Sequence, residues 1–226
     1  MTIALLPSET IIVGRAFLNQ GKISGDENEK RIFSLVEEQL VRVGISLGDE
    51  LYRDPQDGRA WEFAPYLPVM SGGPYILHAL PENKVKQKYK MLGDAVELEK
   101  LAWRIFERSQ RFSHSTYTND DLKIKDYETM ISAVSRAAVE ETSKYKALRI
   151  SWLTDNYLKF IGNHGDETLY FDERGECYWE LVKFDYPPQA LGGGTRRILP
   201  DPHILHCVDE ASAKLKYSSS INPFTT

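Results

Sequence analysis

The chain has 226 residues, and its 42% hydrophobic and 27% charged residues are typical of a globular protein with a sizeable core. Its net charge of -5 argues against a broad phosphate-binding surface, so nucleic acid is not an expected partner. The two cysteines, Cys177 and Cys207, are too few for a disulfide scaffold, and no apolar run approaches membrane length. We therefore expect a cytoplasmic protein without a membrane partner.

The first elements follow from a β-rich run and a helix-capping pattern. Residues 10–17 (TIIVGRAF) predict a strand, which a turn through Gly21 follows. Asp26 is suited to cap a helix, and Glu29 three residues later completes a capping-box pattern. Apolar residues then recur at helical spacing as far as Gly44, where a helix would end in a left-handed residue. We expect a helix from about residue 27 to 43.

A β-hairpin is expected next. Residues 51–63 (LYRDPQDGRAWEF) form two short β-like runs separated by Pro-Gln-Asp-Gly, residues that tolerate tight turns. Alternation along the return strand places Trp61 and Phe63 on one side and an outward-pointing Glu62 on the other, or the reverse. A bend at residues 71–74 (SGGP) then leads to an apolar run over 75–80.

The segment 31–62 returns at 149–180 with a constant offset of 118 residues. About two identities are expected by chance in such a window, so ten indicate a duplicated unit. The second copy has a helical segment ending at Gly162, a hairpin over 169–181 and a glycine run at 192–194, but no obvious counterpart of the opening strand. The identical positions of the first copy are Arg31, Ile32, Leu35, Leu40, Gly44, Leu51, Tyr52, Asp54, Trp61 and Glu62.

The segment between the two copies lacks Gly and Pro from Ala95 to Ile161, which suits helices. The spacing predicts one helix over 96–112, a loop over 113–121, and a second helix from Asp126 onward. We therefore expect an α+β protein in which two pseudo-repeats of helix plus antiparallel hairpin are joined by a helical insert. The expected ranges are 1–82, 83–142 and 143–226, packed as one compact body.

Structural roles are expected for most of the repeated residues. Large aromatic side chains contribute most when buried, so Trp61 and Trp179 are interpreted as core residues. Glu62 and Glu180 lie on the other side of the strand and either bond the neighbouring turn or meet a partner. Asp54 and Asp172 suit turns. The motif set is Asp54, Gly58, Trp61, Glu62, Gly72, Gly73, Asp172, Gly175, Trp179, Glu180, Gly192 and Gly193.

Several of these features together resemble the immunity protein 27 family of bacterial polymorphic-toxin systems. The shared features are Glu9-Thr10, Val13-Gly14, Asp26, Arg31-Ile32, the 51–63 segment and Gly-Gly-Pro; they cover residues 9–81, with a weaker version over about 143–200. The chain departs from the family pattern at Ala60, in having two glycines at 72 and 73, and in Asp172-Glu173 replacing Asp54-Pro55. The resemblance implies a cytoplasmic inhibitor that binds one cognate toxin domain, for which a nuclease is one candidate. No cofactor is implied.

Candidate partner-contact residues are exposed-looking polar clusters and aromatic residues near predicted loops, where recognition usually occurs. An acidic inhibitor would associate faster with a cationic toxin. The candidates are Glu37, Glu38, Tyr66, Tyr75, Asp120, Asp121, Arg196 and Arg197.

Other functional classes remain open at this point. His203, His206 and Cys207, perhaps joined by Cys177, could ligate zinc, but their spacing is not that of a zinc finger and no metal is expected. Paired hairpin carboxylates could catalyse hydrolysis if both copies met across a cleft, yet no nucleophile with an orienting base is recognisable. A protein- or peptide-binding adaptor is the remaining alternative. No catalytic residue is assigned.

Overall fold

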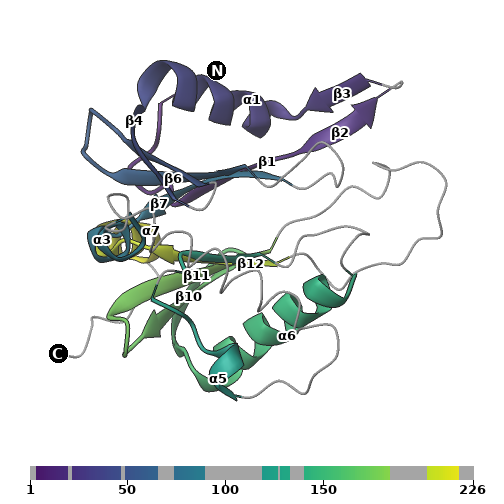
Figure 1. Cartoon of the computed structure of the whole chain (residues 1–226). Coiled ribbons are helices and arrows are strands. Elements are labelled where there is room, and N and C mark those ends of the chain that lie inside the picture. Colours follow the sequence, from purple (N-terminus) through teal and green to yellow (C-terminus); the bar gives the residue numbers. More distant parts are fainter. Residues whose placement is uncertain are drawn as a thin grey trace, which may run out of the picture.

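The computed structural model shows two five-stranded antiparallel sheets that face each other, with helices on their outer sides and at one end (Figure 1). This arrangement confirms the expected α+β class. The described residues are 4–19, 22–46, 49–65, 74–89, 119–126, 128–132, 140–183 and 203–218.

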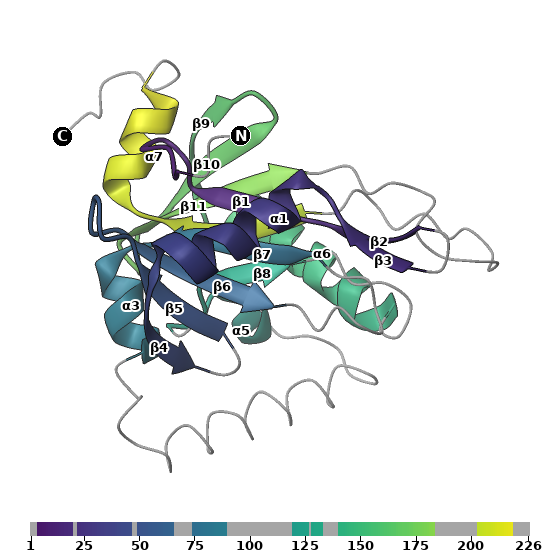
Figure 2. The same ribbon diagram turned by 90° about the horizontal axis from the view of Figure 1, so that it is seen from above.

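The first sheet comes from the N-terminal part of the chain, and its strands lie in the order β1-β7-β6-β5-β4. Helix α1 covers its outer face, and α3 lies at the end of the molecule where α7 also lies (Figures 1 and 2). Its elements are β1 (Ile11–Gly14), α1 (Glu27–Ser34), β4 (Val41–Ser46), β5 (Asp49–Arg53), β6 (Ala60–Pro65), β7 (Tyr75–Leu80) and α3 (Glu82–Tyr89). A separate ribbon pairs β2 (Ala16–Asn19) with β3 (Lys22–Gly25).

The second sheet has the corresponding order, β8-β12-β11-β10-β9. Helix α6 lies on the outer side of this sheet (Figure 1). Its elements are α5 (Asn119–Leu122), β8 (Met130–Ser132), α6 (Glu140–Asn156), β9 (Lys159–His164), β10 (Glu167–Asp172), β11 (Cys177–Lys183), β12 (His203–Val208) and α7 (Glu210–Tyr217).

The predicted ends of the helices in the first and second halves are both wrong. In each half the helix ends earlier than expected and an edge strand follows it. The first α-helix ends at Ser34, and one π-helical turn (Leu35–Gln39) leads into β4, so Gly44 lies in a strand opposite Leu51. The π turn closes when the Leu40 N–H donates to the Leu35 carbonyl at 2.8 Å. In the second half α6 ends at Asn156 and Gly162 lies in β9. Strand pairing overrides the helical spacing there, because an edge strand completes each sheet.

Asp26 caps α1 as expected, with its carboxylate accepting from the Glu29 N–H at 2.8 Å. The predicted strand over 10–17 is instead broken at Arg15, whose N–H donates to the Asp26 carboxylate and whose carbonyl accepts from the Asp26 N–H. Gly14 permits this crossing, because a Cβ there would lie 2.5 Å from the Glu29 Cα. The strand therefore bends at the point where the start of α1 crosses it.

Strand β8 overturns two expectations. Residues 130–132 form a strand rather than part of a helix beginning at Asp126. This strand pairs with β12 as β1 pairs with β7, so the second half has a counterpart of the opening strand. The residue before each strand bonds the adjacent strand in the same way: the Ala79 N–H donates to the Thr10 carbonyl at 2.8 Å, and the Cys207 N–H donates to the Thr129 carbonyl at 2.9 Å. The helix predicted over 96–112 lies outside the described residues.

The two tryptophans are core residues, as predicted. Trp61 is fully buried beneath α1 with Ile32 and Leu35. Trp179 is fully buried with residues of α6, in a cluster that also includes side chains of the first sheet. The cluster around Trp179 thus spans both halves, whereas the cluster around Trp61 belongs to the first half, and each sheet is fixed to a helix by an aromatic side chain.

Candidate functional site

The motif glutamates are buried rather than outward-pointing, which corrects the expectation for both of them. Glu62 is 1% exposed and Glu180 is 0% exposed. Successive residues of a strand point to opposite faces, and the face of β6 opposite Trp61 is turned toward the second sheet. Neither carboxylate bonds a turn or meets solvent, since both are enclosed within the fold.

Four hydrogen-bond donors surround the Glu62 carboxylate. One oxygen, Oε1, lies 3.1 Å from Nε2 of His78 and accepts from the Thr129 hydroxyl at 2.7 Å. The other oxygen, Oε2, accepts from the Tyr89 hydroxyl at 2.7 Å and lies 2.7 Å from the Lys88 ammonium. The site is assembled from β6, β7, α3 and the residue before β8.

The same four donor types surround Glu180. One oxygen lies 3.0 Å from Nε2 of His206 and accepts from the Thr10 hydroxyl at 2.5 Å. The other accepts from the Tyr217 hydroxyl at 2.7 Å and lies 2.9 Å from the Lys216 ammonium. Together the two carboxylates and their eight partners form what we call the paired-glutamate network.

The network joins the two halves in both directions. Thr129, from the second half, bonds the carboxylate of the first, and Thr10, from the first half, bonds the carboxylate of the second. The rings of His78 and His206 meet edge to face, with centroids 5.4 Å apart. Separating the sheets would leave both glutamates without part of their hydrogen-bond shell, which is costly for a buried charge.

Electrostatics keeps the network charged. Burial by itself would raise the pKa of Glu62, but the Lys88 ammonium and the hydrogen bond with His78 outweigh it and hold that pKa below its ordinary value. Burial would likewise raise the pKa of Glu180, and its partners His206 and Lys216 lower it. Burial lowers the pKa of the His78 ring, so this ring is neutral near pH 7.

A third corresponding contact lies outside the network. Arg31 makes a two-pronged ion pair with Glu9 at 2.6 and 2.7 Å, and its guanidinium also donates to a backbone carbonyl. Arg149 makes the same pair with Glu128 at 2.7 and 2.6 Å and donates to two backbone carbonyls. Each pair ties a helix to the segment that precedes the first strand of its sheet.

The hairpin aspartates form turns, as predicted. The Asp54 carboxylate accepts from the Gln56 N–H at 2.8 Å, and the Asp172 carboxylate accepts from the Arg174 N–H at 3.0 Å. Gly58 has a positive φ of 77°, which suits glycine. In the second hairpin the left-handed residue, at φ 48°, is Glu176, the position that matches Gly58, whereas Gly175 has no left-handed φ.

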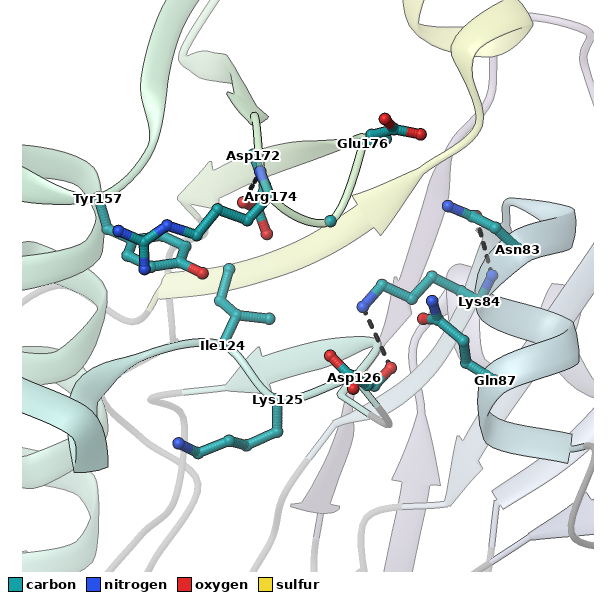
Figure 3. A pocket seen from close by; sticks show the side chains of 11 residues that line it. Asn83, Lys84, Gln87, Ile124, Lys125, Asp126, Tyr157, Asp172, Arg174 and Glu176 are labelled. Atoms are coloured by element: carbon teal, nitrogen blue, oxygen red, sulfur yellow. Dashed lines mark hydrogen bonds between the residues drawn. The ribbon is translucent and has the colours of Figure 1, made fainter.

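A pocket of about 340 Å³ opens between α3, residues 124–126 and the turn after β10 (Figure 3). Lys84 is 2% exposed; its ammonium donates to the Asp126 carbonyl at 3.2 Å and lies over the Trp179 ring. Arg174 crosses the pocket and stacks on Tyr157. Acidic side chains of Asp126, Asp172 and Glu176 line the same space, so its charges are balanced.

The predicted contact residues do not come together. Glu37 and Glu38 are exposed on the π turn after α1, whereas Asp120 and Asp121 lie on α5, across both sheets (Figures 1 and 2). Tyr75 packs against Phe33 and Phe63. The remaining candidates lie outside the described residues; they are Tyr66, Gly72, Gly73, Gly192, Gly193, Arg196 and Arg197.

The sequence contained a signal for the rest of the network that the repeat comparison missed. His78, Lys88 and Tyr89 recur as His206, Lys216 and Tyr217 at an offset of 128, not 118. A comparison at one fixed offset ends at Glu62 and cannot find these three residues. A second offset would have placed them beside their glutamates.

No cluster of metal-binding side chains occurs among the residues that the structure describes. His206 and Cys207 are neighbours on β12, so their side chains leave opposite faces of the strand, and His206 is bound to Glu180. Within the same described ranges, no helix is long and apolar enough to cross a membrane.

Comparison with known proteins gives one result. Residues 18–81 match the model of the family described as Immunity protein 27, over the segment that contains α1, the first hairpin and β7. No curated protein and no solved structure matches the chain. Over residues 18–81, the chain is therefore similar to the immunity protein 27 family.

Proposed function

We propose that the protein binds a cognate bacterial toxin domain and neutralises it by covering its active site or its substrate entry. The observation that carries the proposal is the family match over residues 18–81. Effective protection of a cell requires a dissociation constant of about 1 nM or lower, which corresponds to about -12 kcal/mol. Such affinity favours a rigid binding surface, because ordering flexible segments on binding costs free energy.

The paired-glutamate network supports an inhibitory rather than a catalytic role. Its carboxylates, histidines and tyrosines resemble an acid–base site in composition, but Glu62, Glu180, His78 and His206 are each at most 1% exposed. A general acid or base must come within hydrogen-bond reach of its substrate. We assign the network to holding the two sheets in one fixed arrangement.

We also propose that the second half is a divergent copy of the family unit. Its support is the recurrence of the glutamate network, the arginine pairs and the strand order in both halves. Both units would then contribute to one rigid inhibitor in the cytoplasm of the producing cell.

The test is coexpression with the toxin domain encoded beside this protein, scored by growth and by titration of the purified proteins. We expect protection to saturate at one molecule of inhibitor per molecule of toxin. Protection by trace amounts would instead identify an enzyme that reverses the toxin's damage. Absence of protection, together with capture of several unrelated proteins, would favour an adaptor.

A further inference from the structure

Strand β4 is the outer edge of the first sheet and exposes apolar side chains. Val41, Val43 and Ile45 are 54%, 48% and 43% exposed. Among the described residues β4 pairs with β5 on one side and with no strand on the other, although the Ser46 hydroxyl at its end bonds α3. The free N–H and C=O groups of an apolar edge strand can pair with a further strand, so natural proteins usually cover such edges or place charged residues on them.

The matching edge of the second sheet is more polar, and its one strongly exposed apolar side chain, Phe160, packs edge to face against Tyr170. Strand β9 exposes Lys159, Asn163 and His164, and the counterpart of Val43 is Ile161, which is half-buried against the second sheet's own core. Lys is one of the residues that protect an edge from pairing. The edge with three exposed aliphatic side chains therefore lies in the half that contains the family match.

Exposed acidic residues lie just before β4. Exposed Glu37 and Glu38 precede it, whereas Asp49, at the start of β5, is already paired with the Lys88 ammonium at 2.7 Å. Arg42, the strand's own basic residue, lies 3.6 Å from the Glu50 carboxylate and is thus compensated. The β4 strand of a second copy would not supply Glu37 and Glu38 with a basic partner, because its Arg42 is already paired with Glu50.

We propose that β4 is the docking edge for an extended toxin strand that has apolar residues along its length and carries Lys or Arg at the end that meets Glu37 and Glu38. The strand adds to the first sheet through main-chain hydrogen bonds, and its apolar side chains contact Val41, Val43 and Ile45. The basic end meets Glu37 and Glu38 and speeds association. This inference rests on the proposed function and assigns the surface that performs it.

The test measures binding of a catalytically inactive form of the adjacent toxin domain to the full chain and to two matched variants. Val43→Lys places a charge on the open edge, and Phe160→Lys places the same charge on β9, where Phe160 is 57% exposed. We expect Val43→Lys to weaken binding about 100-fold, as loss of a central contact does, and Phe160→Lys to change it less than about threefold. Both replaced side chains are largely exposed, so thermal unfolding should confirm that both variants remain folded.

A third variant tests the charges. Glu37→Lys combined with Glu38→Lys should slow association at low salt and lose most of that effect at high salt. Wild-type affinity in Val43→Lys would overturn the inference while leaving the proposed function intact, whereas a wild-type chain that fails to bind the toxin would overturn both. A wild-type dimer that Val43→Lys converts to a monomer, with toxin binding unchanged, would assign the edge to a second copy and also overturn the inference.

Discussion

Replacing Glu62 with Gln is the sharpest test of the paired-glutamate network. Gln keeps the shape and one acceptor oxygen, which can still serve His78 and Thr129. Its NH₂ group, however, would face the Tyr89 hydroxyl and the Lys88 ammonium, and an ammonium cannot accept a hydrogen bond. The substitution therefore breaks a buried ion pair at nearly constant volume.

The magnitude follows from what remains around Lys88. Removing one member of a buried ion pair typically costs 3–5 kcal/mol, roughly, because the other charge stays buried. Here Asp49 also lies 2.7 Å from the ammonium and continues to compensate it. We therefore expect a loss of about 3 kcal/mol in the free energy of unfolding. For a chain of this size that is a fall of about 6–12 °C in Tm.

The assay is urea unfolding at pH 7, with Glu180→Gln as the matched variant. Lys216 keeps Glu167 at 2.7 Å, as Lys88 keeps Asp49, so the two losses should agree within about 1 kcal/mol. Adding Lys88→Met to Glu62→Gln should recover part of the stability, because the stranded charge is removed. Losses below about 1 kcal/mol for both glutamines would refute the network's role in stability.

Three further outcomes are expected. Glu176→Gly should stabilise the protein by about 0.5–1 kcal/mol in urea unfolding, because it places glycine at a left-handed position, whereas Gly58→Ala should destabilise it. Gly14→Ala should cost about 1–3 kcal/mol, since the new methyl group would meet the backbone of Glu29; an unchanged Tm would contradict the tight crossing of β1 and α1. Burial lowers the pKa of His78, so the unfolded chain binds its proton first and the unfolding free energy falls as pH drops below about 6.5; His78→Gln should show a shallower fall between pH 6.5 and 5.

The sequence correctly predicted the helix cap and the hairpin turn, because the interactions that stabilise them join residues only a few positions apart. Asp26 bonds the N–H of Glu29, and Asp54 bonds the N–H of Gln56, so the cap and the turn follow from adjacent residue types. The alternation around Trp61 likewise predicted a buried aromatic side chain on one face of a strand. Nothing outside the hairpin is needed for these assignments.

Local sequence could not predict the helix ends or the short strand β8. The spacing from residue 27 to 43 suits a helix, yet Val41–Ser46 gains more by pairing with β5 as the sheet's last strand. Three residues, Met130–Ser132, carry too little pattern to predict a strand, and only the neighbouring β12 makes them one. Tertiary pairing decided both cases.

The sequence alone determined the α+β class, the two hairpins, the aspartate turns, the buried tryptophans and the family resemblance, since each depends on local spacing or on direct identity. Only the tertiary structure decided whether the side chains of Glu62 and Glu180 are buried or exposed. A strand's second face can meet water or another sheet, and local sequence cannot distinguish the two. The donors that make burial of a carboxylate tolerable come from as far as 67 residues away for Glu62 and 170 for Glu180, so only folding brings them together.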